Sequence, residues 1–258
     1  MEVVYLILIS FAASWLTFFS GFGLGTVLTP VFYFLFNDLA LAIAGTAIVH
    51  FLNNLFKFLL MQKSVDWKIA IPFGLASIPA AFLGAYLLVH FEDFEIYQYT
   101  FGGKIYIIKL MNLTFGLLLI VFAIIELIPN FNINLSKKFL WVGGFISGFF
   151  GGLSGHQGAL RTAFLTKYKL DKEVFIATGI VIALGVDIAR SAEYFSSFDL
   201  GVLRENWMIL LVSLLAAFVG AITGKYFLKK MELKILTIII AVSMIVFGIA
   251  LASGLLSR

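Results

Sequence analysis

The chain has 258 residues, of which 62% are hydrophobic and 12% are charged, and its formal net charge is +4. Soluble proteins average about 45–50% apolar and about 25% charged residues, so the composition excludes an ordinary soluble domain. The absence of cysteine excludes disulfides, thiolate metal sites and thiol relays. The excess of basic residues lies mainly in loops, where it indicates membrane orientation rather than binding to nucleic acid.

The hydrophobic segments predict an all-α polytopic membrane protein, because a span of about 20 apolar residues crosses a hydrocarbon core of about 30 Å. The first half contains the segments 3–20, 26–36, 39–61, 69–90 and 105–128. The second half contains the segments 139–153, 159–167, 172–195, 204–228 and 233–256. The pieces 139–153 and 159–167 are too short to cross alone, so we expect half-helices. Four aspartates precede hydrophobic runs and are expected to cap helix N-termini: Asp38, Asp66, Asp171 and Asp199.

Two glycine-rich stretches, 21–30 and 148–161, interrupt the segments at matching places in the two halves. Glycine in a helix costs about 1 kcal/mol relative to alanine, so we interpret both stretches as breaks in helices. Inside a membrane, non-helical backbone is tolerated only where protein buries it or where it lines a polar cavity. Paired broken segments in two halves of a hydrophobic chain therefore point to the substrate site of a transporter.

The two halves are similar enough to predict an N-terminal repeat, 1–130, and a C-terminal repeat, 131–258, each with four hydrophobic segments of which the first is broken. Residues 80–85 (AAFLGA) match residues 216–221 (AAFVGA). A shift of 133 residues superposes four landmark pairs: Gly25 on Gly158, Asp38 on Asp171, Lys57 on Arg190 and Asp66 on Asp199. Evenly spaced charges together with this local match indicate a duplication.

Loop charges suggest how the repeats are oriented. Lysines place the loops 61–68 and 129–138 in the cytoplasm, and the acidic loop 91–103 outside. Eight plain crossings would then put the lysines of 167–172 and 225–234 outside, against the positive-inside rule. If 139–167 is instead a re-entrant hairpin, both clusters fall inside, and an odd number of crossings makes the repeats inverted. We prefer the hairpin, although the length of the first run leaves eight crossings open.

The glycine breaks are the first candidate binding site, because backbone amides at the start of a half-helix offer free donors and the positive end of the helix dipole. We expect such starts at Gly25 with Thr26, and at Gly158. The candidate substrate-binding residues here are Gly23, Gly25, Thr26, Ser154, His156, Gln157 and Gly158. Close helix packing is the alternative role of the glycines, but packing alone does not call for His156 and Gln157 beside them.

Charged residues inside the segments form the second group of candidates, since an intramembrane charge is costly and usually functional. Arg161 could bind an anion directly through two parallel hydrogen bonds; pairing with Asp187 is the alternative. Asp187 and Arg190 are one helical turn apart and are expected to pair with each other. An intramembrane carboxylate such as Asp187 is also a natural carrier of a coupling proton.

A polar stripe on segment 39–61 forms the third group, in which four residues share one helical face at spacings of three, four and seven: His50, Asn53, Asn54 and Lys57. We expect this stripe to face a cavity. Lys57 alone could instead reach the membrane surface by snorkelling. His50 or His156 could shuttle a proton, because imidazole titrates near neutral pH.

The breaks resemble the TauE/SafE family of sulfite exporter-like transmembrane proteins, whose members carry Gly-x-Gly-Gly-Gly, four residues and Pro early in each half. In the first copy Leu24 replaces one glycine, and the motif residues present are Gly21, Gly23, Gly25 and Pro30. The second copy reads SGHQG over residues 154–158, with Ala163 in place of the proline. The resemblance extends over essentially the whole chain, and it implies transport of sulfite, sulfonates or other small sulfur- or carboxylate-bearing anions.

We therefore expect a secondary transporter of a small anion in the inner cell membrane, working by alternating access and driven by an ion gradient, most simply of protons. No GxxxxGK[ST] motif is present, so this chain does not hydrolyse ATP by such a site. An anion channel is the alternative, and it would need a continuous polar path. A membrane enzyme and a divalent-metal permease have less support, because catalytic constellations and clustered metal ligands are missing from the sequence. We expect no cofactor, and the sequence leaves a homodimer open.

Overall fold

The computed structural model describes residues 2–16, 24–92, 94–128, 139–227 and 234–256. The helices of the first half are α1 (Glu2–Leu16), α2 (Leu24–Phe36), α3 (Leu39–Met61), η1 (Gln62–Ser64), α4 (Trp67–His90) and α5 (Leu110–Leu127). Those of the second half are α6 (Leu140–Ser154), α7 (Gln157–Leu165), η3 (Thr166–Tyr168), α8 (Lys172–Ser197), α9 (Gly201–Glu205), α10 (Trp207–Phe227) and α11 (Lys234–Ala252). Two strands, β1 (Glu95–Phe101) and β2 (Lys104–Lys109), complete the described elements.

Five helical segments in the described residues are long and apolar enough to cross a membrane: Leu39–Ser64, Trp67–His90, Leu110–Leu127, Lys172–Ser197 and Trp207–Phe227. The apolar helices of the two broken segments are shorter: Val3–Leu16, Leu24–Phe36 and Leu140–Ser154. The chain is thus a multi-pass, almost entirely helical membrane protein, as the hydrophobic segments predict.

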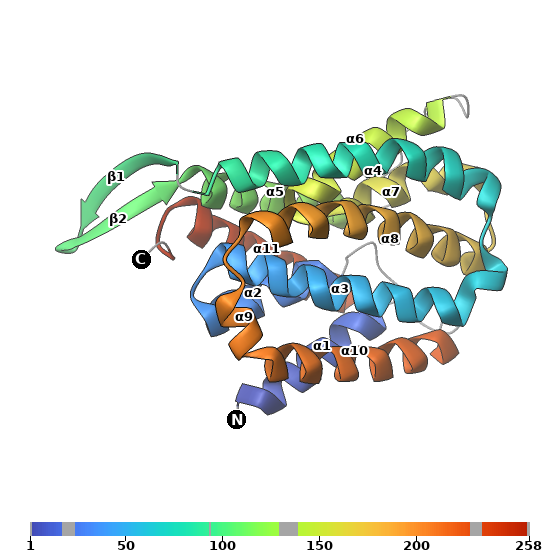
Figure 1. Ribbon diagram of the computed structural model, residues 1–258, viewed down its shortest axis with the longest axis horizontal. Helices are drawn as coiled ribbons and strands as arrows, with labels where there is room; N and C mark the ends of the chain where they lie inside the picture. The colour runs from blue at the N-terminus through green and yellow to red at the C-terminus, as the bar shows by residue number, and fades with distance from the viewer. Residues whose placement is uncertain (1, 17–23, 93, 129–138, 228–233, 257–258) are drawn as a thin grey trace.

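The helices pack in pairs that join the two halves (Figure 1). Helix α1 packs along α10, α6 along α4, α5 along α11, and α3 along α8. The largest cluster of buried apolar side chains connects α2 and α3 with α5 and α11, and includes Phe32, Phe115 and Leu119. This arrangement places α3 and α8 at the centre of the molecule, beside both broken segments.

The seam between α4 and α6 has backbone lying against backbone. A Cβ atom built on Gly144, Gly148 or Gly152 of α6 would collide with a backbone carbonyl of α4, namely those of Phe73, Ser77 and Ala81. Small residues allow helices in a membrane to approach this closely. Gly148 and Gly152, which the sequence assigns to the second break, therefore lie within α6 and serve packing. For these two glycines, close helix packing, the alternative to anion binding, is therefore the role that the structure shows.

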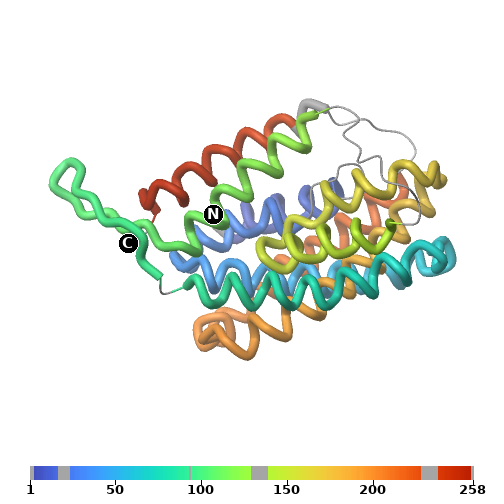
Figure 2. The backbone as a smooth tube through the Cα atoms, turned by 90° about the horizontal axis from the view of Figure 1, so that it is seen from above, coloured from blue at the N-terminus to red at the C-terminus, as the bar shows by residue number. Residues whose placement is uncertain are grey.

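A β-hairpin corrects the all-helical prediction in one region. The segment expected at 105–128 becomes helical only at Leu110, because residues 104–109 form β2 and pair with β1. Gly102 and Gly103 both have positive φ, +59° and +76°, as a two-residue hairpin turn between right-twisted strands requires. The hairpin projects from one end of the helices (Figures 1 and 2), and Tyr99 donates a hydrogen bond of 2.8 Å to the Ser253 carbonyl.

The predicted caps form in part. The Asp38 carboxylate accepts a hydrogen bond of 2.8 Å from the Leu41 N–H at the start of α3, and Asp66 accepts one of 3.0 Å from Lys68 at the start of α4. Asp171 lies at the N-cap of α8 without a side-chain capping bond. Asp199 binds Gly201 at the start of α9, since the expected segment 204–228 is divided between the short α9 and α10.

Candidate functional site

The second broken segment is a helical hairpin. Helix α6 ends at Ser154, Gly155 adopts a left-handed conformation with φ +77°, and α7 begins at Gln157. Helix α7 then runs back along α6, so that Ser147 Oγ donates a 3.1 Å hydrogen bond to the Gln157 carbonyl and Gly143 lies against Phe164. Figure 2 shows the two helices side by side. The half-helices therefore lie where the sequence places them, within two residues.

We call the start of α2, residues 24–26, the first tip, and the turn between α6 and α7, residues 154–158, the second tip. The predicted site residue Gly23 lies outside the described residues. Gly25 packs on α3, because a Cβ built on it would lie 3.5 Å from Thr46 Cγ2 and 3.9 Å from His50 Cδ2. Its carbonyl accepts a 2.8 Å hydrogen bond from Thr29. Thr26 is buried beside it.

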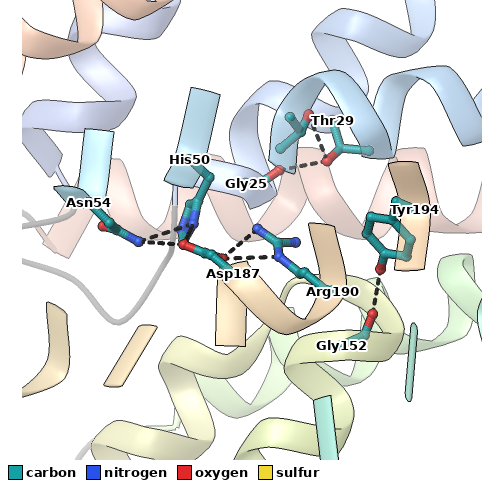
Figure 3. Close-up of polar contacts among 9 residues, drawn as sticks. Gly25, Thr29, His50, Asn54, Gly152, Asp187, Arg190 and Tyr194 are labelled. Carbon is teal, nitrogen blue, oxygen red and sulfur yellow. Dashed lines mark hydrogen bonds and ion pairs between the residues drawn. The ribbon is translucent and has the colours of Figure 1, made fainter. Parts of the chain in front are cut away.

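A buried ion-pair cluster connects α3 and α8 at the centre of the molecule (Figure 3). Nδ1 of His50 lies 2.7 Å from Oδ2 of Asp187, and Asn54 donates a 2.9 Å hydrogen bond to the same oxygen. The other carboxylate oxygen lies 3.0 Å from Nε and 2.9 Å from Nη2 of Arg190. The pair expected from the spacing of Asp187 and Arg190 is present, and both residues are fully buried or nearly so.

The same cluster touches the second tip. A Cβ built on Gly155 would lie 2.6 Å from Nη1 of Arg190, so the guanidinium occupies the space beside the turn. Tyr194, one turn further along α8, donates a hydrogen bond to the carbonyl of Gly152 near the end of α6. Helix α8 therefore binds the C-terminal end of α6, where a positive charge complements the helix dipole.

The polar stripe of α3 is divided between two neighbours. His50 and Asn54 bind Asp187, whereas the other two members bind the end of α1. Lys57 donates a 3.2 Å hydrogen bond to the Ser14 carbonyl, and Asn53 accepts one of 3.1 Å from the Ser14 hydroxyl. Lys57 is only 3% exposed, which rules out snorkelling. The expectation that all four residues face one cavity is therefore replaced by two separate sets of contacts.

The second tip has buried polar atoms without hydrogen-bond partners in the described part of the chain. They include both ring nitrogens of His156 and both side-chain polar atoms of Gln157. The His156 ring lies between Phe115 and Phe122 of α5, with centroid distances of 5.7 and 5.8 Å. Gly158 is buried in α7, and the Ser154 hydroxyl bonds back to the Phe150 carbonyl at 3.1 Å.

Arg161 extends from α7 toward α8 and lies across Gly179, whose added Cβ would be 3.1 Å from the guanidinium Nε. Its Nη1 is buried and has no hydrogen-bond partner among the described residues. Asp187 is bound by His50, Asn54 and Arg190. Arg161 makes no direct ion pair with Asp187, whose charge acts on it from a greater distance. Within the described ranges, no three His, Asp or Glu side chains gather as a metal site would require.

Sequence reasoning missed several residues of this centre. Tyr194 gave no signal, because a single tyrosine in an apolar segment is indistinguishable from core filling. Ser14 sits in the first apolar run, and only the fold brings it to Lys57, 43 residues away. Phe115 and Phe122 are two of 29 phenylalanines, and nothing in the sequence distinguishes them.

Comparison with known proteins covers nearly the whole chain. A family model described as sulfite exporter TauE/SafE matches residues 6–251. A probable membrane transporter protein of Methanocaldococcus jannaschii is 24% identical over 191 residues, which is 68% of this chain and 67% of the relative. No solved structure gives a significant match. Both tips and the central cluster lie inside the region that the family model matches.

Proposed function

Because the chain belongs to the sulfite exporter TauE/SafE family, we propose that it is a secondary transporter that binds a small anion between the two tips. The anion is sulfite, an organosulfonate or a related sulfur- or carboxylate-bearing species. The carrier resides in the inner cell membrane and is driven by an ion gradient, most simply of protons. Membrane transport itself agrees with the family and with the name of the archaeal relative.

The observation that carries this proposal is the set of unpartnered buried polar groups at the second tip. A buried donor or acceptor without a partner costs about 1–3 kcal/mol, so a ligand that supplies partners is the natural explanation. Both side-chain polar atoms of Gln157 and Nη1 of Arg161 are of this kind among the described residues. They lie on the N-terminal half of α7, where the helix dipole also favours an anion.

The charges near the tips favour an anion over a cation. Arg161, Arg190 and Lys57 contribute buried or partly buried positive charge. The carboxylate at this centre, Asp187, is already engaged on both oxygens by His50, Asn54 and Arg190. A cation would find no free carboxylate in this cluster, whereas an oxyanion can bind the planar guanidinium of Arg161 through two hydrogen bonds.

Alternating access rests on two inverted repeats, for which the packing gives support. A Cβ on Gly84 of α4 would meet the Phe149 carbonyl and the Leu153 nitrogen of α6. A Cβ on Gly220 of α10 would meet the Phe11 carbonyl and the Trp15 nitrogen of α1 in the same way. Corresponding helices run in opposite directions, as α3 and α8 do in Figure 1. Two copies of one unit, turned over, would produce both features.

In this proposal the α6–α7 hairpin enters and leaves the membrane on the cytoplasmic side. The nine residues of α7 extend about 14 Å at 1.5 Å per residue, which is about half of a hydrocarbon core. Single cysteines introduced at Lys137 and Lys172 of this cysteine-free chain are expected to react only with reagents added to the cytoplasmic face. Labelling from opposite faces would replace the hairpin by plain crossings and remove the inverted repeat.

Counterflow in proteoliposomes tests the transport mechanism. Vesicles preloaded with sulfite or methanesulfonate should take up a labelled trace of the same anion faster than empty vesicles, and the rate should saturate with concentration. A carrier gives both results because the protein must change conformation once for each anion that it transports. An unsaturable flux that preloading leaves unchanged would identify an anion channel instead. Absence of binding and of flux for sulfite, methanesulfonate and acetate would overturn the proposed substrate class.

A further inference from the structure

His50 is held in one orientation by the central cluster. The guanidinium of Arg190 keeps Asp187 as a carboxylate, and an ionised carboxylate only accepts hydrogen bonds. Nδ1 of His50, at 2.7 Å from Oδ2, therefore carries the hydrogen and donates it, and the 3.1 Å approach of Asn54 Nδ2 to Nδ1 is a contact between two donors that share Oδ2 as acceptor. Asn54 donates to the same oxygen at 2.9 Å, so both donors converge on it from α3. This tautomer leaves Nε2 of His50 as the basic nitrogen that can take up a proton.

The basic edge of His50 faces the first tip. Ring atom Cδ2 is bonded to Nε2, and a Cβ built on Gly25 would lie 3.9 Å from Cδ2. A proton added at Nε2 would thus place positive charge beside the start of α2, where the dipole of the helix is also positive. The Asp187 carboxylate favours this addition but is already neutralised by Arg190, so an anion at the first tip would make it more favourable.

The other charged groups around His50 reinforce this requirement. Arg190 on α8 and Lys57 on α3 are buried near it, and Arg161 and His156 belong to the adjacent hairpin. Helix α2 contains no charged residue. The remaining charges on neighbouring helices are engaged or lie at their ends: Glu193 near Ser197, Lys225 on the Leu60 carbonyl, and exposed Glu173, Arg204 and Glu205.

The charge of the central cluster therefore couples the binding of the proton to the binding of the anion. With neutral His50, the unit of His50, Asp187 and Arg190 has no net charge; with protonated His50 it has a charge of +1. An anion at the tips stabilises the protonated unit, and the protonated unit stabilises the anion by the same factor, because coupling between two sites is reciprocal. Binding of both together is favoured over binding of either alone.

We infer that His50 binds the coupling proton at Nε2, and that the proton and the anion are carried together as symport. Asp187, Asn54 and Arg190 are positioning residues that fix the tautomer of His50 and the direction of its basic edge. The inference rests on the proposed function, because it requires a transported anion. The proton is taken up from the side on which the anion binds, and it leaves with the anion on the other side.

Methanesulfonate is the best probe for proton uptake, since it does not titrate near neutral pH, whereas sulfite does. Added to weakly buffered purified protein, it should raise the pH of the solution by up to one proton per anion bound. Its Kd should weaken with rising pH, by up to about tenfold per unit. In vesicles, a pH gradient should drive its accumulation. If methanesulfonate does not bind, sulfite is used in the vesicle assay.

His50→Asn is the decisive variant, because its amide can still donate to Asp187 but offers no nitrogen that titrates. We expect methanesulfonate binding that is independent of pH, no proton uptake, and no accumulation on a pH gradient. His50→Gln is a second variant in case the first does not fold. His90→Asn is the matched control, since His90 is an exposed histidine in the last turn of α4.

The outcomes separate the two proposals. Proton uptake and pH dependence of wild-type size in His50→Asn would overturn the role of His50 while leaving the anion transporter intact. Release of protons on anion binding by the wild type would overturn symport in favour of exchange, and absence of any proton change would overturn proton coupling at this site. Failure of the wild type to bind or exchange methanesulfonate and sulfite would overturn the proposed function itself.

Discussion

Each half has a buried cation beside an end of its broken segment, Lys57 and Arg190, which the predicted 133-residue shift superposes, but the two cations have different neighbours. In the first half Lys57 binds the Ser14 carbonyl of α1. In the second half Arg190 lies beside Gly155 of α6 and is neutralised by Asp187. The residue of α3 that matches Asp187 is Asn54, and the two contact each other at 2.9 Å. If the halves are repeats, as the sequence predicts, the carboxylate of this cluster is present in the second half alone.

The largest effect is expected at Arg161, a charge of α7 that the first half lacks, since its counterpart in α2 is the buried Leu28. Arg161→Gln should abolish methanesulfonate transport in proteoliposomes while the protein still folds. Adding Asp187→Asn should not restore transport, because the two residues are not paired. Arg161→Lys keeps the charge but loses the two-pronged geometry, so binding should weaken without disappearing. A folded Arg161→Gln variant with the wild-type rate would remove this residue from the site.

The next effect concerns the carboxylate that distinguishes the halves. Asp187→Asn leaves Arg190 buried without its counter-charge and should lower the free energy of unfolding by about 3–5 kcal/mol. Adding Asn54→Asp returns a carboxylate to the cluster, now from α3 of the first half and one turn before Lys57. The double variant should therefore recover part of the lost unfolding free energy. Unfolding of the purified protein in detergent, followed by tryptophan fluorescence, measures both. Equal stability of the single and double variants would contradict the equivalence of the two positions.

A smaller effect is expected at the second tip. Gly155→Ala places a side chain at φ +77° and against Nη1 of Arg190. The left-handed conformation alone costs about 1–2 kcal/mol, and displacement of the guanidinium adds to it. Gly74→Ala on α4 is the control, because a Cβ there meets nothing within 4 Å. Its stability in the same unfolding assay should equal or exceed that of the wild type, and a matching loss in both variants would count against a special role of the turn.

The smallest effect is expected at Lys57. Lys57→Met keeps a similar shape and removes a charge whose burial is costly, which offsets the loss of the hydrogen bond to the Ser14 carbonyl. We expect a change of less than about 1 kcal/mol in unfolding free energy, far below that of Asp187→Asn. A loss of unfolding free energy as large as that of Asp187→Asn would show that the two halves depend equally on their buried charges. It would contradict the difference between them described above.

Local features of this molecule could be predicted from the sequence. The break between α6 and α7, the shortness of these two helices, and the pair formed by Asp187 and Arg190 follow from glycine content, length and spacing within one segment. The β-hairpin could also have been found, since Gly102–Gly103 is a hairpin-turn signal between the alternating stretch 97–101 and the isoleucine-rich stretch 104–109. It was missed because hydrophobicity alone assigns residues 105–108 to the following helix.

The partners of the polar stripe could not be predicted in this way. His50 meets Asp187 across 137 residues, and Tyr194 meets Gly152 across 42. Periodicity indicates that four polar residues share a face of α3, but it does not indicate which neighbouring helix each of them contacts. That division depends on the packing of α3 between α1 and α8, which a single sequence without homologues does not encode in any local pattern.

The seam between α4 and α6 also has a mechanical consequence. Side-chain contacts can adapt to small displacements by changing rotamer, but carbonyls packed against Gly144, Gly148 and Gly152 have no such freedom. Sliding along this seam would require a jump of about 6 Å, four residues at 1.5 Å each, to bring the next glycine into register. Helices α4 and α6 should therefore move together as one rigid unit. The pivots of any rocking motion then lie at the ends of this unit, in the η1 turn before α4 and in the turn at Gly155 after α6.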